Sequence, residues 1–101
     1  MTPEAALAMV EARLLGPESI PVRIRTRIAI TDVEIAELYA ALDVLIVHYQ
    51  DQDAVPKTLA AAFVDIYNGF VQRFEQDAEQ ARRLEDMAIA LQDKAYQLLG
   101  A

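Results

Sequence analysis

The feature of this 101-residue chain that most limits its fold is a hydrophobic register that runs from residue 60 to residue 98. Its positions follow one another at alternating steps of three and four, the spacing of a helix that packs along another helix. Asp77 is the single polar member, and the twelve positions are Ala60, Phe63, Tyr67, Phe70, Phe74, Asp77, Ala81, Leu84, Ala88, Leu91, Ala95 and Leu98. We therefore predict one long, coiled-coil-like helix over residues 56–99.

Two positions leave alternatives open within this predicted helix. The register passes through Gly69 without a shift, which favours a continuous helix, bent there at a cost of about 1 kcal/mol relative to alanine. The alternative is that Asn68 and Gly69 form a turn or a cap and split the segment. Asp77 is either exposed to solvent or a polar core residue that fixes the register or pairs with an arginine.

The apolar stripe of this helix is longer than the rest of the chain is expected to cover. Alanine and leucine alternate along it, which lets a partner helix approach closely. The other long helix, expected over residues 31–50, is too short to shield the whole of it. We therefore predict a homodimer, in which a second copy covers the rest of the stripe. The aromatic cluster of Tyr67, Phe70 and Phe74 is interpreted as core packing, or otherwise as a docking surface for a partner helix.

Capping signals predict two further helices. Thr2 and Pro3 suit the N-cap and first helical positions, and Gly16 with Pro17 suits a stop, which predicts a helix over residues 3–15. Thr31 and Glu34 form a capping box at the start of the second helix, over residues 31–50. The C-terminal half of that helix is apolar nearly all round, so it is expected to be buried within the fold or against a partner.

Residues 22–30 are interpreted as a short β-strand. Val22, Ile24, Thr26, Ile28 and Ile30 alternate strictly with Arg23, Arg25, Arg27 and Ala29. Period-2 alternation of β-branched residues is typical of a half-buried strand, although an extension of the following helix is the competing interpretation. A lone strand leaves its backbone hydrogen bonds unmet, so we expect it to pair with the same segment of a second copy, through Ile24 and Ile28.

This strand, followed by two helices over about residues 22–70, resembles the ribbon-helix-helix family of DNA-binding regulators. The resemblance implies a dimeric strand with Ile24, Ile28 and Ile30 facing inward. It also implies that Arg23, Arg25 and Arg27 contact base edges in the major groove. The alternative is that these three arginines form an outward face that pairs with acids of the helices.

The charge distribution disfavours nucleic acid and anionic membranes as partners. The net charge is −7, and residues 32–101 hold thirteen acids against five bases, whereas residues 1–31 hold three acids against four. The longest apolar run covers only residues 44–47, and the N-terminus shows no basic and apolar leader. We expect a cytoplasmic protein without a membrane span.

Few residues in the chain suit catalysis or metal binding. There is no cysteine, one histidine (His48) and one serine (Ser19), which has no neighbouring histidine or glycine elbow. Asp51 and Asp53 begin like a calcium loop, but Pro56 stands where that loop needs glycine. We expect His48 to be a structural residue near a helix end, and we predict no catalytic residue, metal or cofactor.

The sequence thus predicts a single, mainly α domain over residues 1–101: a helical bundle with a long C-terminal helix and one strand completed by dimerisation. Its predicted function is a non-enzymatic interaction or assembly module (an adaptor, chaperone-like or regulatory subunit) that binds itself and another protein. The predicted interface consists of Phe63, Tyr67, Phe70, Phe74, Ala81, Leu84, Ala88, Leu91, Ala95, Leu98, Ile24 and Ile28.

Overall fold

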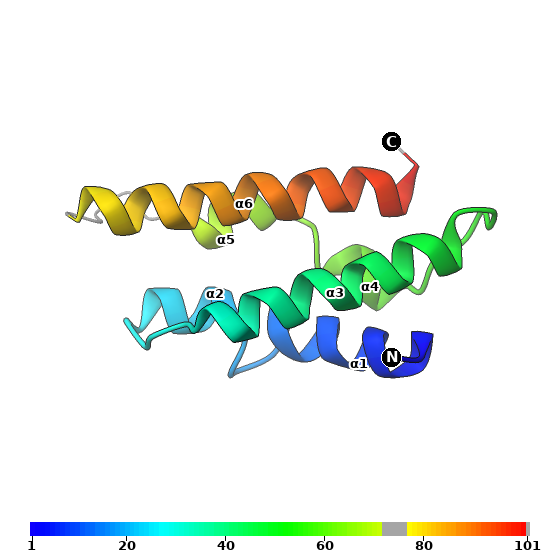
Figure 1. Ribbon diagram of the computed structural model, residues 1–101, viewed down its shortest axis with the longest axis horizontal. Coiled ribbons are helices and arrows are strands. Elements are labelled where there is room, and N and C mark those ends of the chain that lie inside the picture. Colours follow the sequence, from blue (N-terminus) through cyan, green and yellow to red (C-terminus); the bar gives the residue numbers. More distant parts are fainter. Residues whose placement is uncertain (72–76, 101) are drawn as a thin grey trace.

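The computed structural model describes residues 1–71 and 77–100, and within these ranges the chain is mainly helical, with six helices and no strand (Figure 1). The helices are α1 (Pro3–Leu14), α2 (Ile20–Arg25), α3 (Asp32–Tyr49), α4 (Lys57–Ala61), α5 (Ile66–Phe70) and α6 (Ala78–Leu99).

The three long helices lie roughly along one axis of a molecule that measures 42 × 24 × 20 Å. In Figure 1, α3 lies between α1 and α6, antiparallel to α1 and running in the same direction as α6. Helix α3 packs against both of them, and α5 packs against α6. Helix α3 is therefore the element that connects the two halves of the core.

The expected starts of α1 and α3 are confirmed. The Thr2 hydroxyl accepts a hydrogen bond from the Ala5 amide (3.1 Å), and the Thr31 hydroxyl accepts one from the Glu34 amide (3.1 Å). Each bond satisfies an amide that has no partner in the first helical turn. Helix α1 ends at Leu14, where the chain becomes extended, and Gly16 then adopts a positive φ of 92°.

The prediction of a β-strand over residues 22–30 is wrong, because this segment begins as helix α2. The Ser19 hydroxyl caps the helix by accepting from the Val22 amide (3.4 Å), and Pro21 lies in its first turn. Both features favour a helix start. Ile20 and Ile24 are one helical turn apart and both are buried. Burial of this pair outweighs the β propensity that the alternation indicated.

The competing interpretation, an extension of the following helix, is also wrong. Helix α2 ends at Arg25, where the Thr26 hydroxyl donates a hydrogen bond to the Val22 carbonyl (2.9 Å). Arg27 adopts a positive φ of 59°. Such a conformation ends a right-handed helix, so α2 and α3 are separate elements.

The prediction of one continuous helix over residues 56–99 is wrong as well. Helix α4 ends at Ala61, and Asp65 precedes α5 with a positive φ of 61°. The chain is extended at Val71, and α6 begins only at Ala78. Gly69 lies within α5, so it is neither a bend in one continuous helix nor a turn or cap that splits the segment. An added Cβ at this position would be 3.4 Å from the Cβ of Pro21.

Asp77 is the N-cap of α6 and not a position in a helical seam. Its Oδ1 accepts hydrogen bonds from the amides of Glu79 (2.9 Å) and Gln80 (3.2 Å). The register nevertheless continues on both sides of the break, because α5 and α6 pack against each other and bury their apolar faces in the same core. Two helices that share one core therefore produce the same spacing as one long helix.

The apolar stripe of α6 is covered within the chain. Leu84, Ala88, Leu91, Ala95 and Leu98 are all at most 6% exposed, and α6 packs on α3 and α5. A second copy is therefore not needed to cover this stripe.

Candidate interaction surface

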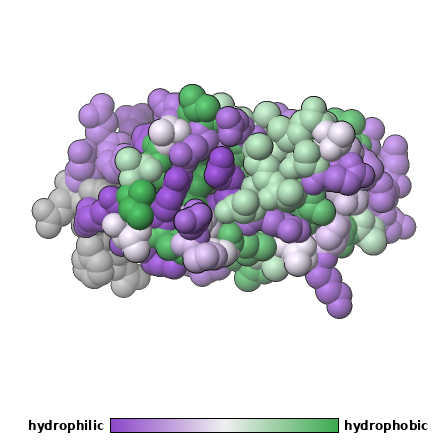
Figure 2. Space-filling view, turned by 90° about the horizontal axis from the view of Figure 1, so that it is seen from below, coloured by the Kyte–Doolittle hydropathy of each residue, from purple (hydrophilic) through white to green (hydrophobic). Residues whose placement is uncertain are grey.

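Exposed apolar residues occur on several parts of the molecule, Ile28, Val64 and Ile89 among them, and one group lies on α1 and on the neighbouring side of α3. We call this surface the α1–α3 face, and its members are Met1, Pro3, Ala5, Ala8, Ala12, Ala40, Val44 and Val47. Val47 is 65% exposed and Met1 is 60% exposed. Figure 2, which looks onto α1, shows hydrophobic residues gathered over this helix.

The spacing of these residues explains why they stay at the surface. On α1 the core side carries Ala6, Val10 and Leu14. Ala5, Ala8 and Ala12 occupy the opposite side, because they follow a second 3-4 spacing about half a turn away. Helix α3 shows the same double pattern, with Leu38, Leu42 and Leu45 in the core and Val47 outside.

A shallow depression lies where α1 begins and α3 ends. Pro3 lines it from α1, and Asp43, Val44, Val47 and His48 line it from α3. The His48 ring lies edge-on to the Tyr49 ring, with centroids 4.7 Å apart. The prediction that His48 lies at a helix end is confirmed, although its side chain is exposed and not partly buried.

The charges next to this depression are mostly negative. Asp43 is held by the Lys94 ammonium, which donates to its Oδ1 at 2.6 Å. Glu4 follows Pro3, and Asp51 and Asp53 follow the end of α3; all three are exposed, and Asp53 also lines a separate depression against the end of α6. We call these three residues the acidic rim. Within residues 1–71 and 77–100, none of them has a cation within salt-bridge distance.

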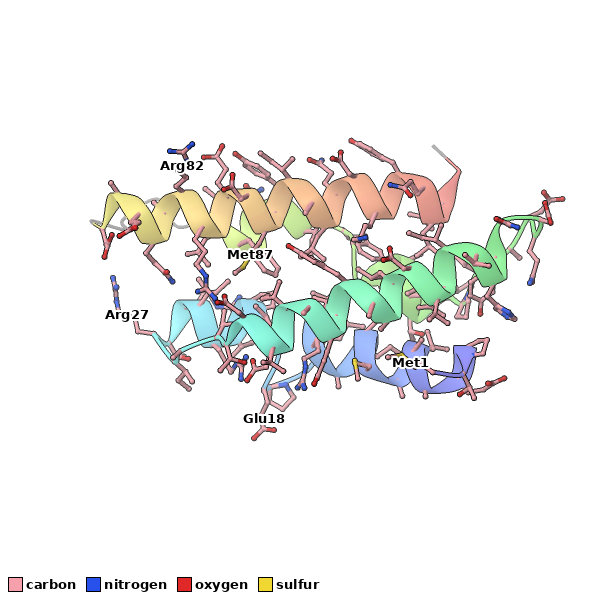
Figure 3. The ribbon with its side chains drawn as sticks, in the orientation of Figure 1. Met1, Glu18, Arg27, Arg82 and Met87 are labelled. Atoms are coloured by element: carbon pink, nitrogen blue, oxygen red, sulfur yellow. The ribbon has the colours of Figure 1, made fainter. Side chains whose placement is uncertain are left out.

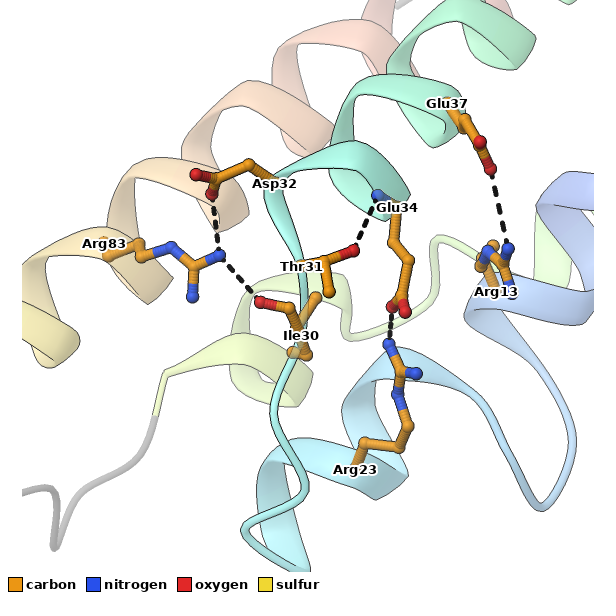
Figure 4. A network of polar contacts seen from close by, with 8 residues as sticks. All are labelled: Arg13, Arg23, Ile30, Thr31, Asp32, Glu34, Glu37 and Arg83. Carbon is orange, nitrogen blue, oxygen red and sulfur yellow. Dashed lines mark hydrogen bonds and ion pairs between the residues drawn. The ribbon is translucent and has the colours of Figure 1, made fainter.

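A network of ion pairs fixes α1 and α2 to the first half of α3 (Figure 4). Arg23 of α2 donates to Glu34, and the Nη2 atom of Arg13 on α1 lies 3.7 Å from Glu37. The hydrogen bond from Arg23 lowers the pKa of Glu34, and the positive charges of Arg23 and Arg13 add to this effect. The pKa of Arg23 is raised by the same bond. Both arginines keep a buried Nε without an acceptor, so the pairing is incomplete.

A second set of contacts ties α3 to α6. Arg83 donates to the carbonyl of Ile30 and to Oδ1 of Asp32, both at 3.0 Å. Lys94 pairs with Asp43, and its Nζ also lies 5.5 Å from the ring centre of Tyr39, whose pKa is raised by burial. Polar contacts thus link α3 to α1, α2 and α6 between Ile30 and Asp43.

Most of the residues that the sequence suggested as an interface lie inside the chain. Phe63, Phe70, Leu84, Ala88, Leu91, Ala95, Leu98 and Ile24 are buried in the core. Tyr67 is half-buried and donates to Glu85 at 3.0 Å, which raises the Tyr67 pKa. Ala81 is half-buried, Ile28 is 57% exposed, and Phe74 lies outside the described residues.

The three arginines of the predicted strand do not share one outward face. Arg23 is engaged by Glu34, whereas Arg25 and Arg27 are exposed. The pairing of Arg23 agrees with the alternative that these arginines contact acids of the helices. The strand that the ribbon-helix-helix resemblance requires is absent from the described part of the chain, so the DNA-binding interpretation is not taken further.

The α1–α3 face was missed because it is built from alanines and from valines that resemble core residues. One signal was available: the C-terminal half of α3 is apolar nearly all round, which already indicated burial on more than one side. The core takes only one of those sides, and Val47 is left in solvent.

Across residues 1–71 and 77–100, no group of three or more histidine, cysteine or acidic side chains is arranged to hold a metal ion. In the same residues no helix has both the length and the hydropathy needed to cross a membrane. Comparison with models of protein families, with curated protein sequences and with solved structures gives no match to this chain.

Proposed function

We propose that this chain is a non-enzymatic protein-binding module and that its contact surface is the α1–α3 face. The observation that carries the proposal is the exposure of Val47 in a shallow depression that Val44 and Pro3 also line, where α1 packs against α3. Monomeric proteins seldom leave a contiguous apolar patch in solvent unless a partner covers it. The rigidity of the two helices lowers the entropic cost of covering it.

The outer side of α6 supports a partner less well. Ile89 and Tyr96 are exposed there, at 46% and 51%. However, charged residues separate them on the same side: Arg82, Glu85, Asp86 and Asp93. Scattered apolar residues among charges are ordinary for a protein surface. The α1–α3 face differs because three of its apolar members, Pro3, Val44 and Val47, line one shallow depression.

Site-specific photo-crosslinking in the host cell tests this proposal. A photoreactive phenylalanine analogue replaces Val47 in one variant and Ile89 in the other, since both are exposed apolar residues of long helices. We expect a crosslinked product of higher mass from position 47 and none from position 89. Equal products from both positions, or none from position 47, would reject the α1–α3 face as a contact surface.

The expected homodimer remains a proposal that the same experiment addresses. The α1–α3 face is the surface through which two copies would now meet, because the α6 stripe is covered. A crosslinked product of twice the chain mass would identify a second copy as the occupant. Light scattering at micromolar concentration would then also have to give a dimer.

A further inference from the structure

We infer that the partner of the α1–α3 face is a basic amphipathic helix of another protein, docked in the depression between the start of α1 and the end of α3. This inference rests on the proposed function and adds the chemistry of the partner. It follows from the shape of the depression, from the charges around it and from the charges elsewhere on the molecule.

The depression is suited to an apolar anchor. Val44, Val47 and Pro3 supply most of its lining, and Asp43 is already neutralised by Lys94. An amphipathic helix that lies in an apolar groove inserts side chains at i, i+3 or i+4, and i+7. Alanines at Ala5 and Ala40 flank the valines and leave room for a helix to approach closely.

The negative charge of the acidic rim predicts a positively charged partner. Glu4, Asp51 and Asp53 are exposed and have no cation within the described residues. The C-terminal end of α3 adds negative partial charge from its last carbonyl groups, of which Gln52 Nε2 satisfies that of His48 at 2.9 Å. Lysine or arginine side chains along the flanks of a docked helix would meet this potential.

A second copy of the chain is a poorer occupant. A two-fold contact through this face brings two identical acidic rims together, which is repulsive. A head-to-tail contact would need a basic patch, but Arg13, Arg23, Arg83 and Lys94 are paired within the chain. The exposed cations of the described residues, Arg25, Arg27, Lys57 and Arg82, are spread over α2 and the turn after it, α4 and α6. Figure 3 shows Arg27 and Arg82 toward the end of the molecule that lies away from Met1.

Binding of designed peptides to the full chain tests the inference, with fluorescence anisotropy as the readout. Three labelled peptides share one helical length. The first has leucines at the i, i+3, i+4, i+7 positions and lysines on the flanks; the second keeps the leucines but has glutamates; the third keeps the lysines but has serines. We expect only the first to bind, with a Kd on the order of 10–100 μM, as for small transient interfaces.

Two variants and one control identify the surface used. Val47→Asp is expected to weaken binding of the first peptide at least about tenfold, since a carboxylate would occupy the apolar depression. The triple variant Glu4→Gln, Asp51→Asn, Asp53→Asn is expected to weaken binding by about tenfold at low salt and to reduce its salt dependence. Ile89→Asp on α6 is expected to change nothing.

The outcomes separate this inference from the proposed function. Equal binding of the leucine–glutamate peptide would contradict a basic partner. A serine–lysine peptide that binds as well as the first would contradict an apolar anchor, and either result would overturn the inference of a basic amphipathic helix. Failure of all three peptides while position 47 still crosslinks in the cell would reject a basic helix but retain the α1–α3 face. Loss of the crosslink at position 47 would instead reject the proposed function itself.

Discussion

Helices α3 and α6 are both long, and both bury a leucine-rich stripe in the same core, yet they differ on the sides that face water. The outer side of α6 is mainly charged, as the amphipathic pattern requires. The outer side of α3 carries Ala36, Ala40 and Val47, with Val44 at its edge. Ala36, Ala40 and Val47 are exposed and add little to the core, whereas Val44 packs partly against it. Contact of the α3 side with a partner, as proposed above, would account for this contrast.

The largest effect that tests this contrast is expected from Leu91, which is fully buried on α6. Leu91→Ala should lower the free energy of unfolding by about 3 kcal/mol, since it removes core contacts and leaves a cavity. Val47→Ala should change it by less than about 0.5 kcal/mol. Urea denaturation of both variants measures the difference. Similar values for the two would mean that α6 is not covered by its own chain.

A smaller effect is expected from the ion pair that links α2 to α3. Glu34→Gln should destabilise the protein by about 1.5 kcal/mol at pH 7, because it removes a charge-assisted hydrogen bond from Arg23 that is partly shielded from water.

The pH dependence of this effect has a definite sign. The pKa of Glu34 is lowered in the folded state, so its carboxylate stabilises the fold above the unfolded pKa of about 4.3. That contribution is lost as the pH falls through the lower, folded pKa. The stability gap between wild type and Glu34→Gln should therefore narrow below about pH 4. A gap that stays constant down to pH 2 would contradict the role of the charge.

The smallest effect distinguishes the observed break before α6 from a continuous helix. Asp77→Leu would stabilise a coiled-coil seam, but it should destabilise this structure by about 1 kcal/mol, because the side chain caps α6. Asp77→Asn keeps the capping oxygen and should cost only a few tenths of a kcal/mol. Thermal unfolding of the two variants measures this order, and a stabilised Asp77→Leu would restore the single-helix interpretation.

The sequence predicted the parts of the fold that local chemistry determines. Thr2, Pro3 and Thr31 act on amides one turn away, so their caps could be identified without tertiary information. The break before α6 could not be identified from the heptad, because a register records which side of a helix is buried and not whether two helices share that side. Asp77 was the available signal, since aspartate is a preferred N-cap residue.

The strand prediction failed for a related reason. Ile20 and Ile24 also fit a helix, and their burial depends on neighbours that the local sequence does not specify. The candidate surface was harder to predict than the fold. Ala8 and Val47 have side chains that are equally common in cores, and only the packing of α1 on α3 leaves them exposed.

The central place of α3 couples the two faces of the molecule. Helix α1 covers one flank of α3 and α6 covers the other, so loss of either cover exposes part of a common core. The chain should then open cooperatively, and a ligand that binds only α1 and α3 would reduce the open population of the whole domain. Amide protons of α6, although the ligand does not touch them, would exchange with solvent more slowly when the opposite side is occupied.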